Sequence, residues 1–349
     1  MPGTKPLKIR PVRWDNGKVV VIDQRRLPLE YVELTLETPE DVAEAIRSMA
    51  VRGAPLIGIV AAYGVALAAD RDPEVDTTLI ALEELTRTRP TARDLFAALE
   101  RMKPVVETPI TVPVGTTEYD ELRRRPLEEA LSIHQRDLMA SGVMKMYAPD
   151  IFTDKGQVMT ICNAGILATG GGGTALGVIV EGYNRGLVEG VFVPETRPLL
   201  QGSRLTCWEL DQQDVPFTLM PDSAAASVLK RRGVTAVVTG ADRVARNGDI
   251  ANKVGTRSLA ILAHAAGIPF YIVAPHTTFD AGIADGSGIE IEERSADEVQ
   301  TCCGIQVTPD TYPVYNPSFD VTEAELITGY VTDKGMFTPD TLKESKLWT

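Results

Sequence analysis

Short runs of β-branched residues alternate with helical patterns along the chain from Gln157 onward. The runs read VMTIC, VEGVFV, PFTLM, TAVVTG and PFYIVA, and each is followed by a loop and a segment with helical periodicity. Strands joined through helices lie parallel in one sheet, because right-handed crossovers pack the helices against its faces. The sequence therefore predicts a doubly wound parallel sheet in an α/β domain.

Polar residues follow these strands and should gather at one edge of the sheet. They are Cys162, Glu195, Asp222, Asp242 and His276. The carboxyl ends of parallel strands face one crevice, where open α/β sheets bind their ligands. We therefore expect the functional site at this edge.

The first part of the chain has a different pattern, which predicts a small sheet followed by helices. Asn16 and Gly17 stand between two extended segments and suit a two-residue hairpin, since both turn residues need positive φ. Thr38 can cap a helix over residues 41–49 that has a proline at its start. Residues 54–69 are nearly all apolar and predict a helix buried in the middle of this domain.

The boundary between the two domains is predicted near residue 125. Thr91 and Asp94 give a capping signal for one more helix in the first domain. Residues 104–125 are dense in proline, threonine and charge, and Pro126 then opens a long helical pattern. We expect a smaller, mostly helical α+β domain over residues 1–125 and an α/β domain over residues 126–349.

Charge and composition exclude several classes of protein. The 349 residues carry a formal net charge of −13, which disfavours a nucleic-acid partner because such partners require clustered Lys and Arg. The apolar stretch 54–69 is shorter than the roughly 20 residues that span a bilayer, and the first ten residues lack the apolar core of a signal peptide. We expect a cytoplasmic protein with neither a membrane nor a nucleic-acid partner.

The cysteines and histidines do not predict a metal site or a disulfide scaffold. Four cysteines show neither the pairing density of a secreted protein nor a zinc spacing, and no histidine and carboxylate have metal-ligand spacing. Free thiols and no metal are expected.

The stretch from Val158 to Gly177 places a thiol beside a glycine-rich loop. Cys162 ends an apolar strand, Gly170–Gly173 free the backbone to turn its amides toward an anion, and Thr174 begins a helix. A thiol near backbone donors and a helix N-terminus has a lowered pKa and can act as base or nucleophile, although most free cysteines are simply buried. The stretch predicts covalent or acid/base chemistry on a phosphorylated small molecule.

A dinucleotide fingerprint is the alternative interpretation of this loop, because Gly170, Gly172 and Ala175 fit GxGxxA. The fingerprint requires its first glycine at the end of the strand, whereas eight positions separate Cys162 from Gly170. We therefore predict no nucleotide and no other cofactor.

Asp242 and Lys253 belong to a second segment with the composition of a site. Asp242 follows a buried strand, and Asn252 and Lys253 are predicted to open a helix. The helix N-terminus is positive and disfavours a lysine, unless a bound anion lies between the two. An ion pair between Asp242 and Arg243 is the alternative role for the aspartate.

A basic residue and a permissive backbone also open the central helix of the first domain. Helix N-termini bind anions through their free amides, and guanidinium or amide donors strengthen such sites. Residues that together supply enough donors for a phosphate dianion are Arg52, Gly53, Ala54, Arg89, Gln201 and Lys253.

Six longer motifs make a family resemblance specific. They are RGAPLIG at 52–58, RPTA at 89–92, CNAGILAT at 162–169, ETRPLLQGSRLT at 195–206, GADRVARNGDIANKVGT at 240–256 and YNPSFDVTEAELITGYVTDKG at 315–335. In this order they resemble the methylthioribose-1-phosphate isomerases, within the larger family that includes regulatory subunits of translation initiation factor 2B. The resemblance implies a small N-terminal domain joined to a Rossmann-like C-terminal domain, usually in a homodimer, and no nucleotide.

The resemblance also implies an activity and the residues for it. The reaction is the conversion of 5-methylthioribose 1-phosphate to 5-methylthioribulose 1-phosphate in methionine salvage. Cys162 and Asp242 match the catalytic pair of the family. Positions that match residues holding the substrate, chiefly its phosphate, are Arg52, Gly53, Ala54, Arg89, Gln201, Asn252 and Lys253.

The sequence departs from the family pattern at two places beside the cysteine. Ile161 stands where a histidine is usual, and Gly170–Gly173 lacks the usual tyrosine. A reshaped pocket leaves related aldose 1-phosphates open as substrates, with 5-deoxyribose 1-phosphate ahead of ribose 1,5-bisphosphate. A non-catalytic regulatory or scaffold role is the alternative of another class, and the joint presence of Cys162 and Asp242 argues against it.

Overall fold

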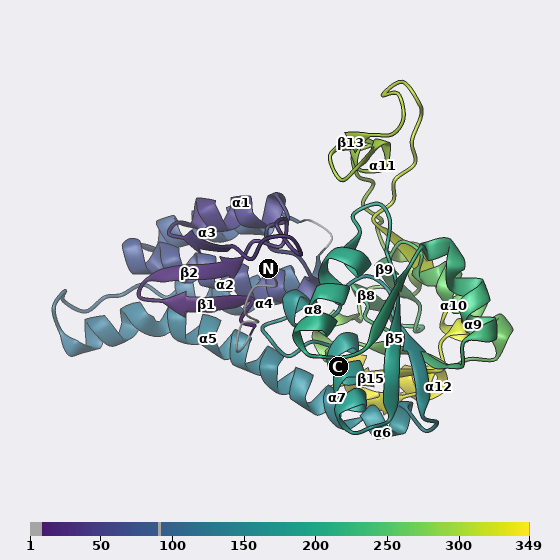
Figure 1. Ribbon diagram of the computed structural model, residues 1–349. Helices are drawn as coiled ribbons and strands as arrows, with labels where there is room; N and C mark the ends of the chain where they lie inside the picture. The colour runs from purple at the N-terminus through teal and green to yellow at the C-terminus, as the bar shows by residue number, and fades with distance from the viewer. Residues whose placement is uncertain (1–8, 90–91, 349) are drawn as a thin grey trace. The chain divides into compact units, whose positions relative to one another are not determined.

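The computed structural model describes residues 9–89 and 92–348, and its chain divides into two compact units (Figure 1). The first unit is Met1–Ala140 with Ile166–Gly173, and the second is Ser141–Gly165 with Thr174–Thr349. The segment Ile166–Gly173 thus belongs to the first unit, although the chain on both sides of it belongs to the second. Each unit has a hydrophobic core of its own.

A three-stranded antiparallel sheet begins the first unit. It contains β1 (Val12–Asp15), β2 (Lys18–Ile22) and β3 (Glu33–Leu36) in sequence order. Asn16 and Gly17 connect the first two strands with φ of 49° and 78°. The predicted hairpin is therefore confirmed, and its turn uses the left-handed backbone that an Asn-Gly pair tolerates.

The first unit continues with helices packed around one buried helix. These are α1 (Pro39–Arg47), α2 (Ala54–Arg71), α3 (Val75–Thr86) and α4 (Arg93–Val106). Thr38 caps α1, as the sequence predicts, and it also forms a capping box with Asp41; the helix begins and ends two residues earlier than the predicted range 41–49. In α2, 15 of the 18 residues are buried, so protein covers its apolar surface. Among the described helices, α2 alone has the length and apolar composition of a membrane-spanning helix. The predicted central helix is confirmed.

The long helix α5 (Thr117–Met146) corrects one prediction. Pro126 does not open this helix, because the helix begins nine residues earlier and contains the proline. Thr116 accepts a hydrogen bond from the Tyr119 amide at 3.1 Å and so caps the earlier start. The helix runs through the boundary predicted between residues 125 and 126, whereas the compact units change at Ala140. The capping role predicted for Thr91 lies outside the described residues.

A seven-stranded sheet forms the centre of the second unit, and it confirms the predicted doubly wound topology. Its order is β16-β15-β10-β7-β4-β5-β6, and all neighbours are parallel except β15 and β16. The strands are β4 (Gly156–Met159), β5 (Val188–Pro194), β6 (Phe217–Met220), β7 (Val234–Thr239), β10 (Phe270–Val273), β15 (Gly329–Thr332) and β16 (Gly335–Phe337).

The strand order reverses direction between β4 and β7. From β4 the chain adds strands on one side as β5 and β6, and it then returns to add β7, β10 and β15 on the other. Open α/β sheets bind ligands at such a switch point, beyond the carboxyl ends of the two strands. Cys162 follows β4 and Asp242 follows β7, so the topology brings the loops of the predicted catalytic pair to the switch point.

Two cores cover the two faces of this sheet, as the alternation of Val158 and Met159 in β4 illustrates. Val158 packs in the core that includes α6 (Ala148–Ile151), α7 (Ala175–Asn184) and α8 (Cys207–Gln212). Met159 packs in the core that includes α9 (Ala225–Arg231), α10 (Thr256–Ala266) and α12 (Pro339–Lys343).

Smaller sheets that the sequence did not predict complete the second unit. One has the order β11-β8-β9-β14, and the other pairs β12 with β13 beside α11 (Asp297–Gln300). Their strands are β8 (Arg243–Ala245), β9 (Ile250–Lys253), β11 (Phe279–Asp280), β12 (Thr301–Cys302), β13 (Ile305–Gln306) and β14 (Phe319–Thr322). Asn252 and Lys253 therefore end a strand, and the prediction that they open a helix is wrong.

Candidate active site

Cys162 lies in a loop three residues beyond the end of β4 and has a left-handed backbone with φ of 61°. Its amide donates a hydrogen bond to Thr196 Oγ1 at 3.0 Å. Its carbonyl oxygen accepts one from the Thr206 hydroxyl at 2.5 Å. Both backbone polar groups of the predicted catalytic cysteine are thus held by threonine side chains.

Thr196 is itself fixed by the carboxylate that follows β6. The amides of Thr196 and Arg197 donate to the two oxygens of Asp222 at 2.7 and 2.8 Å. Thr196 also has a left-handed backbone, with φ of 63°. Two of the predicted strand-end residues, Cys162 and Asp222, are therefore connected through Thr196, and Asp222 holds backbone in place.

A fully buried carboxylate lies under the loop that carries Cys162. Glu209, which has no solvent exposure, accepts a hydrogen bond from Asn163 Nδ2 at 2.8 Å. A Cβ atom at Gly165 would lie 2.1 Å from Glu209 Oε2, so any larger residue there would displace the Glu209 side chain. Burial lowers the pKa of the nearby Lys145, while the negative charges of Glu181 and Glu209 raise it. The loop of Cys162 is thus packed closely against the buried carboxylate of Glu209.

The loops that carry Asp242 and Lys253 pack against the loop of Cys162. A Cβ atom at Gly240 would lie 3.1 Å from Ala164 Cβ, and one at Gly255 would lie 3.2 Å from Ile161 Cδ1. Asp242 is half-buried, and its amide donates to the Ala251 carbonyl at 2.9 Å. The structure therefore brings together the chain segments around Cys162, Asp242 and Lys253 at the switch point.

Arg243, the alternative partner of Asp242, forms an ion pair with Asp280 at 3.6 Å.

Asn252 is fixed by two threonines, because its Nδ2 donates to Thr239 Oγ1 at 3.2 Å and to Thr256 Oγ1 at 2.9 Å. The rigid attachment of Asn252 suits a residue that presents its remaining amide atoms to a ligand.

Lys253 is buried, with 8% of its surface exposed, and its Nζ lies 5.3 Å from the centre of the Phe319 ring. The N-terminus of α10 is capped by Asp320, which accepts hydrogen bonds from the amides of Gly255 at 2.7 Å and Arg257 at 3.0 Å. Burial raises the pKa of Asp320, and these amides lower it. A carboxylate of the protein therefore occupies the first amides of this helix.

Gln201 precedes a π-helical turn, Gly202–Thr206, that leads into α8. The residue is 5% exposed, and its Oε1 has no hydrogen-bond partner among the residues that the structure describes. A Cβ atom at Gly202 would lie 1.8 Å from the Pro194 carbonyl oxygen, which fixes this turn against the end of β5. Single π-helical turns are frequent at functional sites, and a buried amide without a partner suits a ligand-binding residue.

Arg52, Gly53 and Ala54 lie in the first unit, at the start of α2. Gly53 is the N-cap with φ of 97°, and a Cβ atom there would lie 2.5 Å from Ala168 Cα, so glycine is required. Described side chains provide no cap for this helix, and its first turn has no acidic residue. The N-terminus of this 18-residue helix keeps the positive field that favours an anion. Arg89 is half-buried between α3 and α4.

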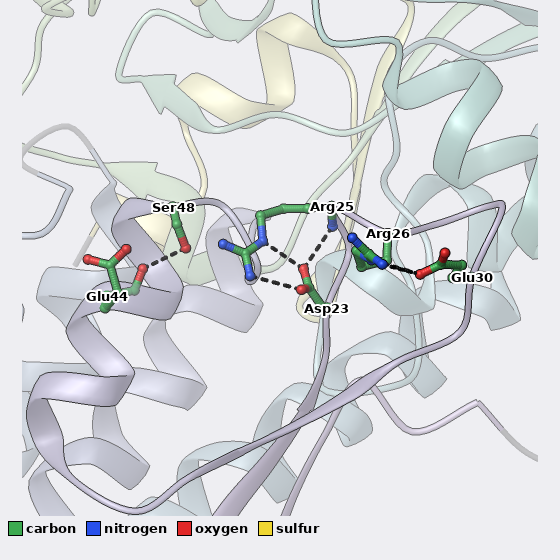
Figure 2. Close-up of polar contacts among 6 residues, drawn as sticks. All are labelled: Asp23, Arg25, Arg26, Glu30, Glu44 and Ser48. Atoms are coloured by element: carbon green, nitrogen blue, oxygen red, sulfur yellow. Dashed lines mark hydrogen bonds and ion pairs between the residues drawn. The ribbon is translucent and has the colours of Figure 1, made fainter. Parts of the chain in front are cut away.

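A turn after β2 supports the chain that leads to Arg52. Figure 2 shows Asp23 with the Arg25 guanidinium, which donates to both carboxylate oxygens at 2.8 Å and lowers the pKa of Asp23. Between them, the Gln24 amide donates to the Ala50 carbonyl at 3.0 Å, and Gln24 Nε2 donates to the Leu167 carbonyl at 2.8 Å. This turn therefore ties the approach to α2 to the segment Ile166–Gly173.

The glycine-rich loop does not present its amides as the sequence analysis expected. The Gly170 amide donates to Asp137 Oδ2 at 2.7 Å, while the amides of Gly171 and Gly173 donate to Thr169 Oγ1 at 3.3 and 2.8 Å. For these three amides the predicted role in binding a ligand anion is wrong. The glycines instead let the backbone fold onto protein side chains.

Two residues of α5 hold both backbone groups of Gly170. His134 Nε2 lies 2.7 Å from the Gly170 carbonyl, and His134 Nδ1 lies 2.9 Å from the Tyr63 hydroxyl. A carbonyl only accepts, so Nε2 carries the proton. Burial lowers the pKa of His134, whereas burial raises the pKa of Asp137 to about 7 against the lowering effect of the Gly170 amide.

The remaining strand-end residues and cysteines contribute less to the site. His276 Nδ1 lies 2.8 Å from Asp333, and burial would raise the pKa of Asp333 but its hydrogen bonds with His276 lower it. The Glu195 amide donates to the Met220 carbonyl at 2.9 Å. All four cysteines are free thiols. Among the described ranges, no three His, Cys, Asp or Glu side chains are grouped to hold a metal ion.

Sequence reasoning missed four residues with structural roles around the site. Thr196 could have been found, since it lies three residues beyond a predicted strand and next to Glu195. Thr206, Glu209 and Asp137 lie in helical segments and had no such signal. Their importance arises from tertiary hydrogen bonds across more than 30 positions of sequence.

Known proteins similar to this chain agree with its motifs and topology. Residues 50–339 match the Initiation factor 2 subunit family. Curated relatives named methylthioribose-1-phosphate isomerase include proteins of Heliobacterium modesticaldum, 44% identical over 95% of this chain and 96% of theirs, and of Alcanivorax borkumensis, 45% identical over 95% of each.

Two solved structures are also similar over nearly their whole length. The crystal structure of 5-methylthioribose 1-phosphate isomerase from Pyrococcus horikoshii OT3 has a TM-score of 0.89 at 41% identity, covering 100% of this chain and 98% of that one. A structure titled as the delta subunit of translation initiation factor eIF-2B from A. fulgidus has a TM-score of 0.82 at 36% identity, covering 98% and 99%. The chain therefore belongs to the initiation factor 2 subunit family, together with the methylthioribose-1-phosphate isomerases.

Proposed function

We propose that this chain is an aldose–ketose isomerase that converts 5-methylthioribose 1-phosphate to 5-methylthioribulose 1-phosphate, with Cys162 and Asp242 as its acid/base pair. Relatives with this activity in their names, 44% and 45% identical over nearly the whole chain, support the isomerase assignment. The observation that carries the acid/base pair is the packing of the Cys162 and Asp242 loops at the switch point of the sheet.

The chemistry explains why an acid and a base are needed together. An aldose 1-phosphate has a blocked anomeric oxygen, so its ring does not open without protonation of the ring oxygen. In this mechanism Asp242, which is half-buried, supplies that proton. The Cys162 thiolate then takes the proton from C2 and returns it to C1 through an enediol-like intermediate. As the C2 carbonyl forms, the proton of the C2 hydroxyl returns to the Asp242 carboxylate, which gives the ketose 1-phosphate and restores both residues.

The residues that bind the sugar phosphate are proposed from the family motifs, separately for each compact unit. Gln201, with its unpaired buried oxygen, and the fixed Asn252 and buried Lys253 supply polar groups in the second unit. Arg52 and Arg89 supply guanidinium groups in the first, where Gly53 and Ala54 expose the amides of α2. Ile161 is buried in an apolar core. An apolar neighbour of the cysteine suits a 5-methylthio or 5-deoxy group better than the second phosphate of ribose 1,5-bisphosphate.

Two variants test the acid/base pair on the whole chain. Cys162→Ser and Asp242→Asn should each lower kcat by roughly 10²- to 10⁴-fold with little change in thermal stability, because each removes a positioned acid or base. Full turnover by folded Cys162→Ser would refute the role of the thiol. In deuterium oxide, proton transfer predicts label at C1 of the product, whereas a hydride shift from C2 to C1 leaves C1 unlabelled.

A regulatory protein without activity is the second candidate function. The similarity to the structure titled as an eIF-2B delta subunit, at 36% identity, favours it. The two functions separate in one assay, since a regulatory protein would leave 5-methylthioribose 1-phosphate and 5-deoxyribose 1-phosphate unchanged. A cytoplasmic homodimer is proposed in either case from the family resemblance, and sedimentation of the purified chain tests the dimer.

A further inference from the structure

The backbone of Cys162 is held in an unfavourable conformation by two threonine side chains to which the sequence analysis assigned no role. We propose that Thr196 and Thr206 are positioning residues that hold Cys162 in the left-handed region and so fix the direction of its thiol. This inference deepens the proposed function, because it depends on Cys162 as the base. It assigns a role in the reaction to two residues that do not themselves have to touch the substrate.

The left-handed conformation requires such support. At φ of 61°, the Cβ of Cys162 crowds the following carbonyl group, which is why residues other than glycine, asparagine and aspartate rarely adopt it. A residue of this kind persists only where its surroundings fix it, and such residues gather at active sites. Without support the loop would relax, and the Cα–Cβ bond of Cys162 would point elsewhere.

The direction of each threonine hydrogen bond follows from its partners. The Thr196 hydroxyl has one proton, which it donates to the Pro194 carbonyl at 3.2 Å, so its oxygen accepts from the Cys162 amide. The Thr206 hydroxyl donates to the Cys162 carbonyl and accepts from Asn163 Nδ2 at 3.3 Å. Each hydroxyl both donates and accepts, and valine, which has the same shape, can do neither.

The two threonines also belong to one rigid frame. Asp222 holds Thr196 through two amides. The turn that carries Thr206 begins at Gly202, where a Cβ atom would lie 3.0 Å from Thr196 Oγ1. Because the two segments pack closely, the two hydroxyl groups that bond the Cys162 backbone are held at fixed positions relative to each other. Rigid packing of this kind fixes the orientation of the Cys162 side chain better than a mobile loop would.

The test removes each hydroxyl while it preserves the shape of the side chain. Thr196→Val and Thr206→Val should lower kcat roughly 10- to 100-fold and leave KM within about threefold, since misplacement of a reacting group by about 1 Å costs this much. The serine variants keep the hydroxyl and should retain most of the wild-type kcat. A matched control is Thr332→Val, which removes a buried hydroxyl that donates to the Gly335 carbonyl at 3.0 Å in the turn between β15 and β16, and it should leave kcat unchanged.

A second readout does not depend on turnover. The rate at which iodoacetamide alkylates Cys162, followed on its peptide by mass spectrometry, should change severalfold in the two valine variants and stay at the wild-type rate in Thr332→Val. One outcome combines this pattern of alkylation rates in the variants with a wild-type chain that isomerises neither sugar. In that case the proposed function fails and the positioning role stands. The positioning role fails if folded valine variants keep the wild-type kcat and alkylation rate, or if folded serine variants lose activity as the valine variants do.

Hydrogen exchange decides the matter if a valine variant does not fold. The Cys162 amide of the wild-type chain should exchange slowly, because the Thr196 hydroxyl oxygen accepts its proton. In folded Thr196→Ser this protection should remain. Rapid exchange of this amide in the wild-type chain would overturn the proposal.

Discussion

Asp137→Asn should make the protein more stable at neutral pH, and this gain should shrink as the pH falls toward the ordinary pKa of an aspartate, 3.8. Burial raises the pKa of Asp137 to about 7, against the lowering effect of the Gly170 amide and with a further increase from the negative charge of Asp94. Asparagine does not titrate, but it keeps an oxygen that can accept the hydrogen bond from Gly170. The variant therefore isolates the cost of the buried charge.

The sign and size follow from proton linkage. The ordinary pKa of the group is 3.8, so between pH 4 and 7 the unfolded chain is ionised while the folded chain keeps its proton. The wild-type free energy of unfolding then falls as pH rises, by about 1.4 kcal/mol per pH unit. From pH 5 to 7 this amounts to roughly 2–3 kcal/mol, and partial exposure of Asp137 to solvent reduces it to about 1–2 kcal/mol.

Urea unfolding of the wild type and the variant at pH 5, 6, 7 and 8 measures this effect. The stability difference between them should already be present at pH 5, because Asp137 of the unfolded chain ionises above pH 3.8, and it should grow by about 1–2 kcal/mol more to its full value by pH 8. Asp41→Asn is the matched control: burial would raise the pKa of Asp41, but the amides of Glu37 and Thr38 lower it below 3.8. Asp41 stays ionised in both states above pH 5, so its difference should be constant. A constant difference for Asp137→Asn would refute the reasoning.

Three further variants test other parts of the structure. Gly53→Ala should lower the free energy of unfolding by about 3 kcal/mol or more and abolish turnover, because its Cβ would meet Ala168 at 2.5 Å. The control is Gly115→Ala, where φ is 86° and no atom lies within 4 Å of the added Cβ. This control should cost only about 1 kcal/mol in thermal unfolding. Gln201→Met should keep or raise Tm, since it removes an unpaired buried oxygen, while kcat/KM falls at least about tenfold; a lower Tm with normal kcat/KM would contradict its role. Asp320→Ala should cost about 1–2 kcal/mol, because it uncaps α10, and circular dichroism during heating would show an unchanged Tm if the cap were unimportant.

Local patterns in the sequence predicted most of the regular structure. The hairpin at Asn16 and Gly17, the capping box of Thr38, the buried helix α2 and the parallel strands all depend on residues close together in sequence. The start of α5 was missed, because a proline was read as a helix start although a helix of 30 residues accommodates it.

The candidate site was predictable only in part. The positions of Cys162 and Asp242 followed from the rule that loops after parallel strands meet at a switch point. The role of the glycine loop did not, since the partner of the Gly170 amide is the carboxylate of Asp137, 33 positions away on α5. The same holds for Thr206, whose hydroxyl reaches the Cys162 carbonyl across 44 positions. Such contacts form only when the tertiary structure does.

The most direct test of the proposed function is the turnover of the purified chain, without added metal or nucleotide, on 5-methylthioribose 1-phosphate and 5-deoxyribose 1-phosphate side by side. We predict ketose 1-phosphate from the methylthio sugar with the higher kcat/KM, and loss of that product in Cys162→Ser. A higher kcat/KM for the deoxy sugar would contradict the proposed substrate, and no product from either sugar would contradict the isomerase itself.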